Sequence, residues 1–252
     1  NKRIKAGGIR VVNRNLFQRV LSLIYPERCC CCAKPIVCGK LVCDACYPGL
    51  VQILPPFCPE CGLNKQDCSC KGHQRFTDGC ASPFYHEKSA KSALHLLKFA
   101  GKTYGAELFS LYMAGLIKQA FGDVKFDCVT SVPLSSAVLQ KRRYNQSLII
   151  AKGLAGRLKV PYKELLIKKF ETTPQRQLPA YQRSGNVLGV FDVLPKAAEF
   201  IESEGCKTVL LVDDTVTTGA TINECAKMLK LYGVERVYAV TATASRLKDR
   251  DR

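Results

Sequence analysis

The stretch VLLVDDTVTTGAT, residues 209–221, constrains the fold more than any other part of this sequence. An apolar run typical of a buried strand, 208–212, leads into the acids Asp213 and Asp214, and the amphipathic pattern INECAKMLKLYG then predicts a helix that ends at Gly233. Open α/β sheets bind ligands at such strand–loop–helix turns, at the carboxyl ends of parallel strands. We therefore expect the two acids to lie in a loop at a ligand site.

The residues that follow the acids suit an anion. The segment TTGAT places backbone N–H groups at the amino end of the predicted helix, where the helix dipole favours negative charge. Gly219 allows close approach of the backbone, and Thr217, Thr218 and Thr221 add hydroxyl donors. Since carboxylates repel phosphate, the acids must address a neutral part of the same ligand; ribose hydroxyls fit, and Mg²⁺ can bridge them. A ribose 5-phosphate is the predicted ligand, and an acid pair that merely caps the next turn is the alternative.

Elsewhere the chain divides into three segments. Residues 1–25 are basic and predict a short amphipathic helix, 26–75 are rich in cysteine, and 76–252 form the main domain. In that domain apolar β-like runs alternate with helical patterns, which predicts a mostly parallel central sheet flanked by helices. The polar stretch 169–187 predicts a long functional loop. The helical patterns cover 89–100, 104–120, 145–158 and 219–232.

Eleven of the 15 cysteines lie between Cys29 and Cys70. Two-residue gaps let both thiolates of a pair face one tetrahedral metal ion, so four such corners predict two Cys₄ zinc sites. Pairing in chain order is favoured over interleaved pairing, and Cys30, Cys31 and Cys38 are left over. The four corners are Cys29 with Cys32, Cys43 with Cys46, Cys58 with Cys61, and the more closely spaced Cys68 with Cys70.

Disulfide bonds are the alternative for this cluster. We favour zinc because nothing in the sequence indicates secretion and reducing compartments disfavour disulfides. A segment this small cannot fold on apolar burial alone, so metal would supply its folding energy. Four thiolates leave no coordination position open for a substrate, so the expected role of zinc is structural.

The net charge of +17 favours polyanionic partners, nucleic acid and phosphorylated metabolites among them. No apolar run approaches the roughly 20 residues that span a bilayer, and we expect a cytoplasmic protein. The sequence does not predict an oligomeric state.

VLLVDDTVTTGAT resembles the phosphoribosyl pyrophosphate (PRPP) motif of type I phosphoribosyltransferases. Together with the cysteine-rich segment, about nine-tenths of the chain resembles the ComF family of competence proteins. LLKFAGK, SVPLSS, RRYNQS, RSGNVLGVF and Arg246 are further matches. The resemblance implies a type I phosphoribosyltransferase fold with a small N-terminal Cys₄ zinc module, and a role in natural transformation, the uptake of single-stranded DNA.

The resemblance also implies roles for individual residues. Asp213 and Asp214 would hold the ribose hydroxyls at the catalytic centre, with Mg²⁺ accompanying PRPP. Arg143 stands where the family pattern has glycine, so either the backbone tolerates a side chain there or the cation touches an anion. Arg176 and Arg183, on the long loop, are candidate cations for a loop that closes over the substrate. The 5-phosphate would be bound by Thr215, Thr217, Thr218, Gly219, Ala220 and Thr221, and the pyrophosphate by Pro133, Leu134, Ser135, Arg142, Asn145 and Gln146.

Two functions follow. The first is a phosphoribosyltransferase that acts on a base, a nucleotide or a nucleic-acid end. The second is a non-catalytic module in which PRPP is regulatory and the zinc segment binds single-stranded DNA or DNA-processing proteins. Phe76, Phe84 and Tyr85 could stack on bases, although burial in the core is the expected fate of these three rings.

Overall fold

The computed structural model describes residues 26–37, 39–68, 70, 75–99, 101, 103–169 and 189–246. The predicted N-terminal helix, Cys38, and most of the long loop with Arg176 and Arg183 lie outside these residues. Among the described helices, none is both long and apolar enough to cross a membrane.

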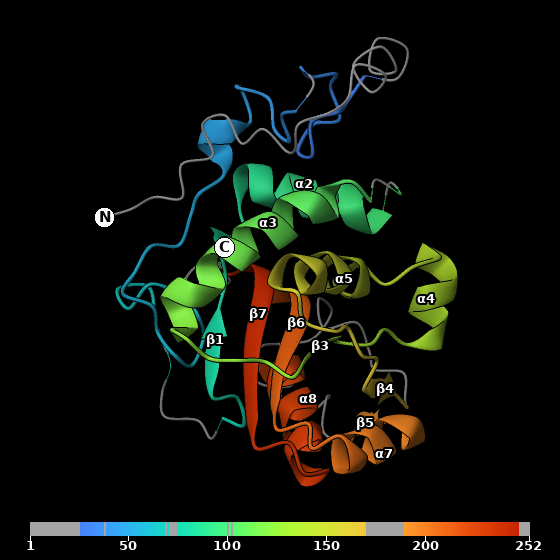
Figure 1. The fold of residues 1–252 in the computed structure, drawn as a ribbon. Helices are drawn as coiled ribbons and strands as arrows, with labels where there is room; N and C mark the ends of the chain where they lie inside the picture. The colour runs from blue at the N-terminus through green and yellow to red at the C-terminus, as the bar shows by residue number, and fades with distance from the viewer. Residues whose placement is uncertain are drawn as a thin grey trace.

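A parallel sheet forms the centre of the molecule (Figure 1). Its strand order is β1-β7-β6-β3, and β2 also pairs with β7. The long central strands consist mainly of Val, Leu, Ala and Thr and are almost entirely buried, as expected for a sheet covered on both faces. A separate antiparallel pair consists of β4 and β5. The strands are β1 Gly79–Ala81, β2 Phe84–Tyr85, β3 Cys128–Ser131, β4 Leu166–Lys168, β5 Phe191–Val193, β6 Thr208–Val216 and β7 Arg236–Ala244.

Helices cover both faces of the sheet. In Figure 1, α2, α3 and α5 lie together on one side and α7 and α8 on the other. The four helical patterns predicted from the sequence are confirmed, each within one residue at either end. The short α4 and α7 were not predicted. The helices are α2 Lys88–Phe99, α3 Gly105–Phe121, α4 Ser136–Arg142, α5 Gln146–Leu158, α7 Pro195–Ser203 and α8 Ala220–Leu231, with a 3₁₀ turn, η1, at Tyr47–Gly49.

Strand β6 separates two hydrophobic cores. Leu210 and Val212 belong to the core that includes side chains of α2, α3 and α5. Val209 and Leu211 belong to the core that includes side chains of α7 and α8. Because side chains alternate along a strand, each residue of β6 can be assigned to one face.

The predicted end of this strand was wrong. We expected the strand to stop at Val212, whereas β6 continues to Val216, and Asp213, Thr215 and Val216 also have partners in β7. Thr215 is opposite Thr243, and their hydroxyl oxygens lie 3.2 Å apart, so polar residues extend the ladder beyond the apolar run. The acid pair therefore lies inside a strand and is held more rigidly than a loop would hold it.

The cysteine-rich segment extends both cores. Cys29, Cys30 and Leu50 pack into the core of α2, α3 and α5. Ile53 and Leu63, from the later half of the segment, pack into the other core. The two halves of the segment therefore serve opposite faces of the sheet.

Candidate functional site

The acid pair lies near the carboxyl end of β6, and each carboxyl contacts a helix of the α2, α3 and α5 side. The ammonium of Lys98, in α2, lies 2.7 Å from Oδ1 of Asp214. The hydroxyl of Ser147, in α5, donates a hydrogen bond of 2.9 Å to Oδ1 of Asp213. The acids thus connect β6 to the end of α2 and the start of α5.

The carboxyl group of Asp213 titrates far from its ordinary range. Burial, and then the neighbouring charge of Asp214, raise its pKa from 3.8 to about 7. The backbone N–H of Asp214, the hydroxyl of Ser147 and the charge of Lys98 oppose that shift. The net charge of the cluster formed by Asp213, Asp214 and Lys98 therefore changes near neutral pH.

Lys98 and Ser147 were not among the predicted site residues. A lysine at the end of a predicted helix is equally consistent with an exposed position, yet the side chain of Lys98 is only 14% exposed. The sequence signal for both was present in the family motifs LLKFAGK and RRYNQS, which contain them. Their contacts with the acids, from residues distant in the chain, required the fold.

The turn after β6 has the predicted strand–turn–helix geometry. Residues 217–219 form the bend, Gly219 is the N-cap of α8 with φ at +78°, and Ala220 is the first helical residue. The hydroxyl of Thr218 accepts from the N–H of Ala220 at 3.4 Å. Thr217 and Thr221 are half-buried. The turn therefore brings together hydroxyl groups and the amino end of a helix, as an anion site requires.

A cation from outside the predicted site also reaches this turn. Nη1 of Arg75, the last residue of the cysteine-rich segment, donates to the carbonyl of Thr218 at 3.2 Å. A Cβ atom at position 219 would clash with the same guanidinium. Glycine is needed there both for the positive φ and for the approach of Arg75.

The predicted pyrophosphate residues surround α4. Pro133 and Leu134 are half-buried in the connection from β3, and Ser135 is the N-cap of α4. Asn145 is the N-cap of α5: its side chain accepts from the N–H of Ser147 at 3.0 Å and donates to the carbonyl of Val132 at 2.9 Å. Asn145 thereby fixes the connection after β3 to the start of α5.

Arg142 and Gln146 form a second link. Nη1 of Arg142 donates to Oε1 of Gln146 at 3.1 Å. Gln146 is completely buried, and its Nε2 has no hydrogen-bond partner among the described residues. The guanidinium of Arg142 also lies 5.1 Å from the ring centre of Phe99, which is 53% exposed. An exposed aromatic ring thus stands beside a cation at the edge of the site.

Arg143 occupies a left-handed backbone position. Its φ is +65°, and its N–H donates to the carbonyl of Leu139 at 2.7 Å, which ends α4. Glycine adopts this conformation without strain, which explains the glycine of the family pattern. The side chain of Arg143 is exposed, and the backbone tolerates it.

Two Cys₄ clusters fit a metal ion. In each, all four Sγ atoms lie within 4.8 Å of one another. Four sulfurs at ~2.3 Å from a tetrahedral zinc would be separated by about 3.8 Å; Sγ of Cys32 and Cys43 are 3.8 Å apart, as are those of Cys61 and Cys68. The clusters confirm pairing in chain order. The first is Cys29, Cys32, Cys43 and Cys46, and the second is Cys58, Cys61, Cys68 and Cys70.

Backbone amides support the thiolate form of one cysteine in each cluster, Cys29 and Cys68. The N–H groups of Cys31 and Cys43 each donate to Sγ of Cys29 at 3.4 Å. Burial alone would raise the pKa of Cys29, but these amides outweigh it and lower the pKa to about 7. In the second cluster, the N–H of Cys70 donates to Sγ of Cys68 at 3.3 Å. Ready ionisation is what a zinc ligand needs.

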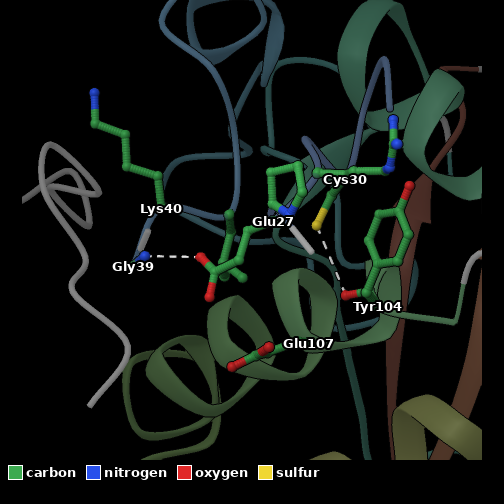
Figure 2. A pocket seen from close by; sticks show the side chains of 9 residues that line it. Glu27, Cys30, Gly39, Lys40, Tyr104 and Glu107 are labelled. Carbon is green, nitrogen blue, oxygen red and sulfur yellow. Dashed lines mark hydrogen bonds between the residues drawn. The ribbon is translucent and has the colours of Figure 1, made fainter. Parts of the chain in front are cut away.

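The segment of the first cluster packs into the core of α2, α3 and α5, and residues beside its ligands line a pocket of about 310 Å³ (Figure 2). Sγ of Cys30 donates to the carbonyl of Tyr104 at 3.7 Å, and the N–H of Gly39 donates to Glu27 at 2.7 Å. Glu107 of α3 lines the other side. As predicted, Cys30 and Cys31 are not ligands; they are buried anchors of the module.

The second cluster is attached to the carboxyl edge of the sheet. Asp67 directly precedes the third ligand of this cluster and accepts a hydrogen bond of 2.5 Å from the hydroxyl of Tyr85. Arg246 lies 3.4 Å from the carboxylate of Asp67, and its guanidinium is 3.8 Å from the ring centre of Tyr85. Burial, and then the bond to Asp67, raise the pKa of Tyr85 to about 12. The predicted burial of Phe84 and Tyr85 in the core is confirmed.

A parallel sheet with an acid pair on β6, followed directly by a turn at the amino end of α8, fits a type I phosphoribosyltransferase fold. The family model for the phosphoribosyl transferase domain matches residues 144–251. Competence protein F of Haemophilus influenzae is 33% identical over 112 residues, covering 44% of this chain and 47% of that protein.

The relatives with longer alignments are also DNA utilization or competence proteins. The DNA utilization protein YhgH of Salmonella typhi is 28% identical over 232 residues, which cover 85% of this chain and 96% of that protein. Competence protein ComFC of Streptococcus pneumoniae is 26% identical over 201 residues, which cover 78% and 84%. The chain spans about half the length of the first curated relatives it matches. These similarities support a relationship to the ComF family of proteins, with a type I phosphoribosyltransferase fold.

Proposed function

We propose that this protein binds PRPP with Mg²⁺ at the carboxyl edge of β6 and uses it, as a phosphoribosyltransferase, in the handling of single-stranded DNA during natural transformation. The names of the relatives, two competence proteins and a DNA utilization protein, support the process. The observation that carries the proposal is the acid pair of β6 directly before the turn at the amino end of α8, because a ribose 5-phosphate needs acceptors for its hydroxyls and donors for its phosphate.

The described residues divide the proposed task. Asp213 and Asp214 would accept hydrogen bonds from the ribose hydroxyls, and the turn 217–219 with the start of α8 would bind the 5-phosphate. Bound Mg²⁺ would neutralise charge on the pyrophosphate. The ammonium of Lys98 pairs with Asp214. When an anionic ligand binds, this ammonium would leave the carboxylate and contact the ligand instead. Residues 133–135 and Arg142 would face the pyrophosphate, and Arg176 and Arg183 would close over it.

The chemistry would be displacement of pyrophosphate from the anomeric carbon of ribose. Positive charge develops on the sugar in such a step, and the ionised acid pair would stabilise it. Thiolate clusters persist in a reducing compartment, so we also propose a cytoplasmic location, with zinc in both clusters.

Thermal unfolding tests the binding proposal. PRPP with Mg²⁺ should raise the melting temperature, and Asp213→Asn combined with Asp214→Asn should abolish that shift. An unchanged shift in the double variant would refute the ribose assignment. Pyrophosphate release, measured with candidate bases and with single-stranded DNA, then tests catalysis; binding without release for any acceptor favours a regulatory role.

The regulatory role has support of its own. Phe99 exposes an aromatic face beside Arg142, and a ring next to a cation is the usual platform for a base of single-stranded nucleic acid. In a non-catalytic module this platform would bind DNA while PRPP controls its position. Phe99→Ala should then weaken oligothymidine binding about 5- to 150-fold, since base stacking contributes about 1–3 kcal/mol. Leu231→Ala, which removes another exposed apolar side chain, is the control and should bind normally.

A further inference from the structure

The segment that carries the second Cys₄ cluster touches the carboxyl edge of the sheet at two points. Near its middle, Asp67 contacts Tyr85 and Arg246, which belong to or follow the edge strands β2 and β7. At its end, Arg75 reaches the turn after β6. The N–H of the next residue, Phe76, donates to the side chain of Asn223 in the first turn of α8 at 2.7 Å. The backbone at Arg75 is therefore fixed against the same helix start that would hold the 5-phosphate.

The guanidinium of Arg75 forms no ion pair with a carboxylate among the described residues. Its Nη1 is bonded to a neutral carbonyl, that of Thr218. Its Nε is buried without a hydrogen-bond partner, and among the described residues no carboxylate pairs with it. Burying an unsatisfied donor of a cation is costly, and such groups are normally completed by an acceptor. The missing acceptor here is an anion.

We propose that Arg75 is a ligand of the 5-phosphate, so that the second Cys₄ cluster and the phosphate site form one unit. This proposal rests on the proposed function. The turn contributes N–H and hydroxyl donors, and Arg75 contributes a charge and a planar pair of donors suited to phosphate. Gly219 leaves the space that the guanidinium occupies. Arg75 lies five positions after Cys70, the last ligand of the second cluster.

The two anionic ends of PRPP allow a direct test by calorimetry. Arg75→Gln should weaken binding of PRPP with Mg²⁺ and of ribose 5-phosphate by a similar factor, roughly 10- to 100-fold, as expected for loss of a charge-assisted bond. Binding of pyrophosphate should not change, because Arg75 acts at the other end. Lys65→Gln removes the same charge from an exposed position in the same segment and should leave all three affinities unchanged.

Arg75→Lys keeps the charge without the planar fork and should recover part of the loss. Equal affinity of Arg75→Gln and wild type for ribose 5-phosphate would overturn this proposal alone. Failure of the wild type to bind PRPP would overturn the proposed function as well.

A measurement on the wild type avoids any folding defect in the variants. Ribose 5-phosphate should protect Arg75 from modification by phenylglyoxal, as read by peptide mass spectrometry, whereas pyrophosphate should not. Equal modification of Arg75 with and without ribose 5-phosphate contradicts the assignment.

Discussion

The ammonium of Lys98 lies 2.7 Å from Oδ1 of Asp214, although the two residues are 116 positions apart. Both side chains are largely buried, at 14% and 13% exposure. The pair places one positive charge next to two adjacent acids and joins the end of α2 to the central strand. Lys98 therefore contributes to the charge of the unliganded site, although its helix, α2, lies outside the PRPP motif.

Removing that ammonium should destabilise the folded protein. Lys98→Met leaves Asp214 buried without its partner, and breaking a buried ion pair typically costs roughly 3 kcal/mol. The expected result is a lower free energy of unfolding in urea at pH 8, with a smaller loss at pH 5, where Asp213 is protonated. Lys91→Met, an exposed position on the same helix, is the control. Equal stability of Lys98→Met and wild type at pH 8 would show that the pair contributes nothing.

The raised pKa of Asp213 predicts how stability varies with pH. From about pH 4 to about pH 7 the folded state keeps a proton that the unfolded chain has released, because the pKa rises from 3.8 to about 7. More bound protons in the folded state mean that the free energy of unfolding falls as pH rises through this window. Urea titrations at half-unit steps should show this slope in the wild type. Asp213→Asn should flatten it, and Asp123→Asn, at an exposed position, should not.

Binding of PRPP should follow the opposite trend. An ionised Asp213 is the better acceptor for ribose hydroxyls and for Mg²⁺, so affinity should increase as pH rises through about 7. Calorimetry from pH 6 to pH 8 measures this. A flat profile in the wild type would contradict the assignment of Asp213 to the sugar.

Metal analysis should find two zinc ions per chain. Cys46→Ser and Cys70→Ser each remove one ligand from a different cluster, so each variant should retain one ion. Cys30→Ala should retain both, because Cys30 is buried beside the first cluster without belonging to it. Chelation should unfold the cysteine-rich segment, since zinc binding supplies much of the folding energy of such modules. A zinc content near zero in the native protein would contradict the assignment of both clusters as zinc sites.

The left-handed position of Arg143 separates backbone strain from ligand contact. Arg143→Gly relieves a conformation that costs an ordinary residue about 1 kcal/mol, partly offset by the entropy of glycine in the unfolded chain. Unfolding stability should therefore change by less than about 1 kcal/mol. If PRPP affinity also stays the same, Arg143 is a tolerated surface residue. A tenfold loss of affinity would instead identify it as a ligand.

Much of the fold was predictable because its signals are local. Helical periodicity located α2, α3, α5 and α8, and the regular gaps between cysteines located both clusters. The end of β6 was not predictable, since the ladder continues through Asp213 and Thr215 only because β7 offers partners beside them. Pairing with β7 therefore extends β6 beyond the apolar run from which its end was predicted.

For the site, the acid pair and the turn were visible in one short motif, whereas their partners were not. Lys98, Ser147 and Arg75 come from three other segments, and nothing in their local sequence specifies what they contact. Such contacts arise from the order of strands in the sheet. Residues far apart in the chain meet there because parallel strands bring all their carboxyl ends to one edge.

The pairing of β1 and β2 with β7 bears on how the protein is made. Gly79 is opposite Tyr238, so the ribosome must produce almost the whole domain before the sheet can be completed. Each cysteine cluster, by contrast, needs fewer than about 20 consecutive residues, a span that closes quickly. During synthesis the metal modules can therefore form before β7 is available to pair with β1 and β6. In that interval the unpaired strands make the nascent chain most prone to aggregation.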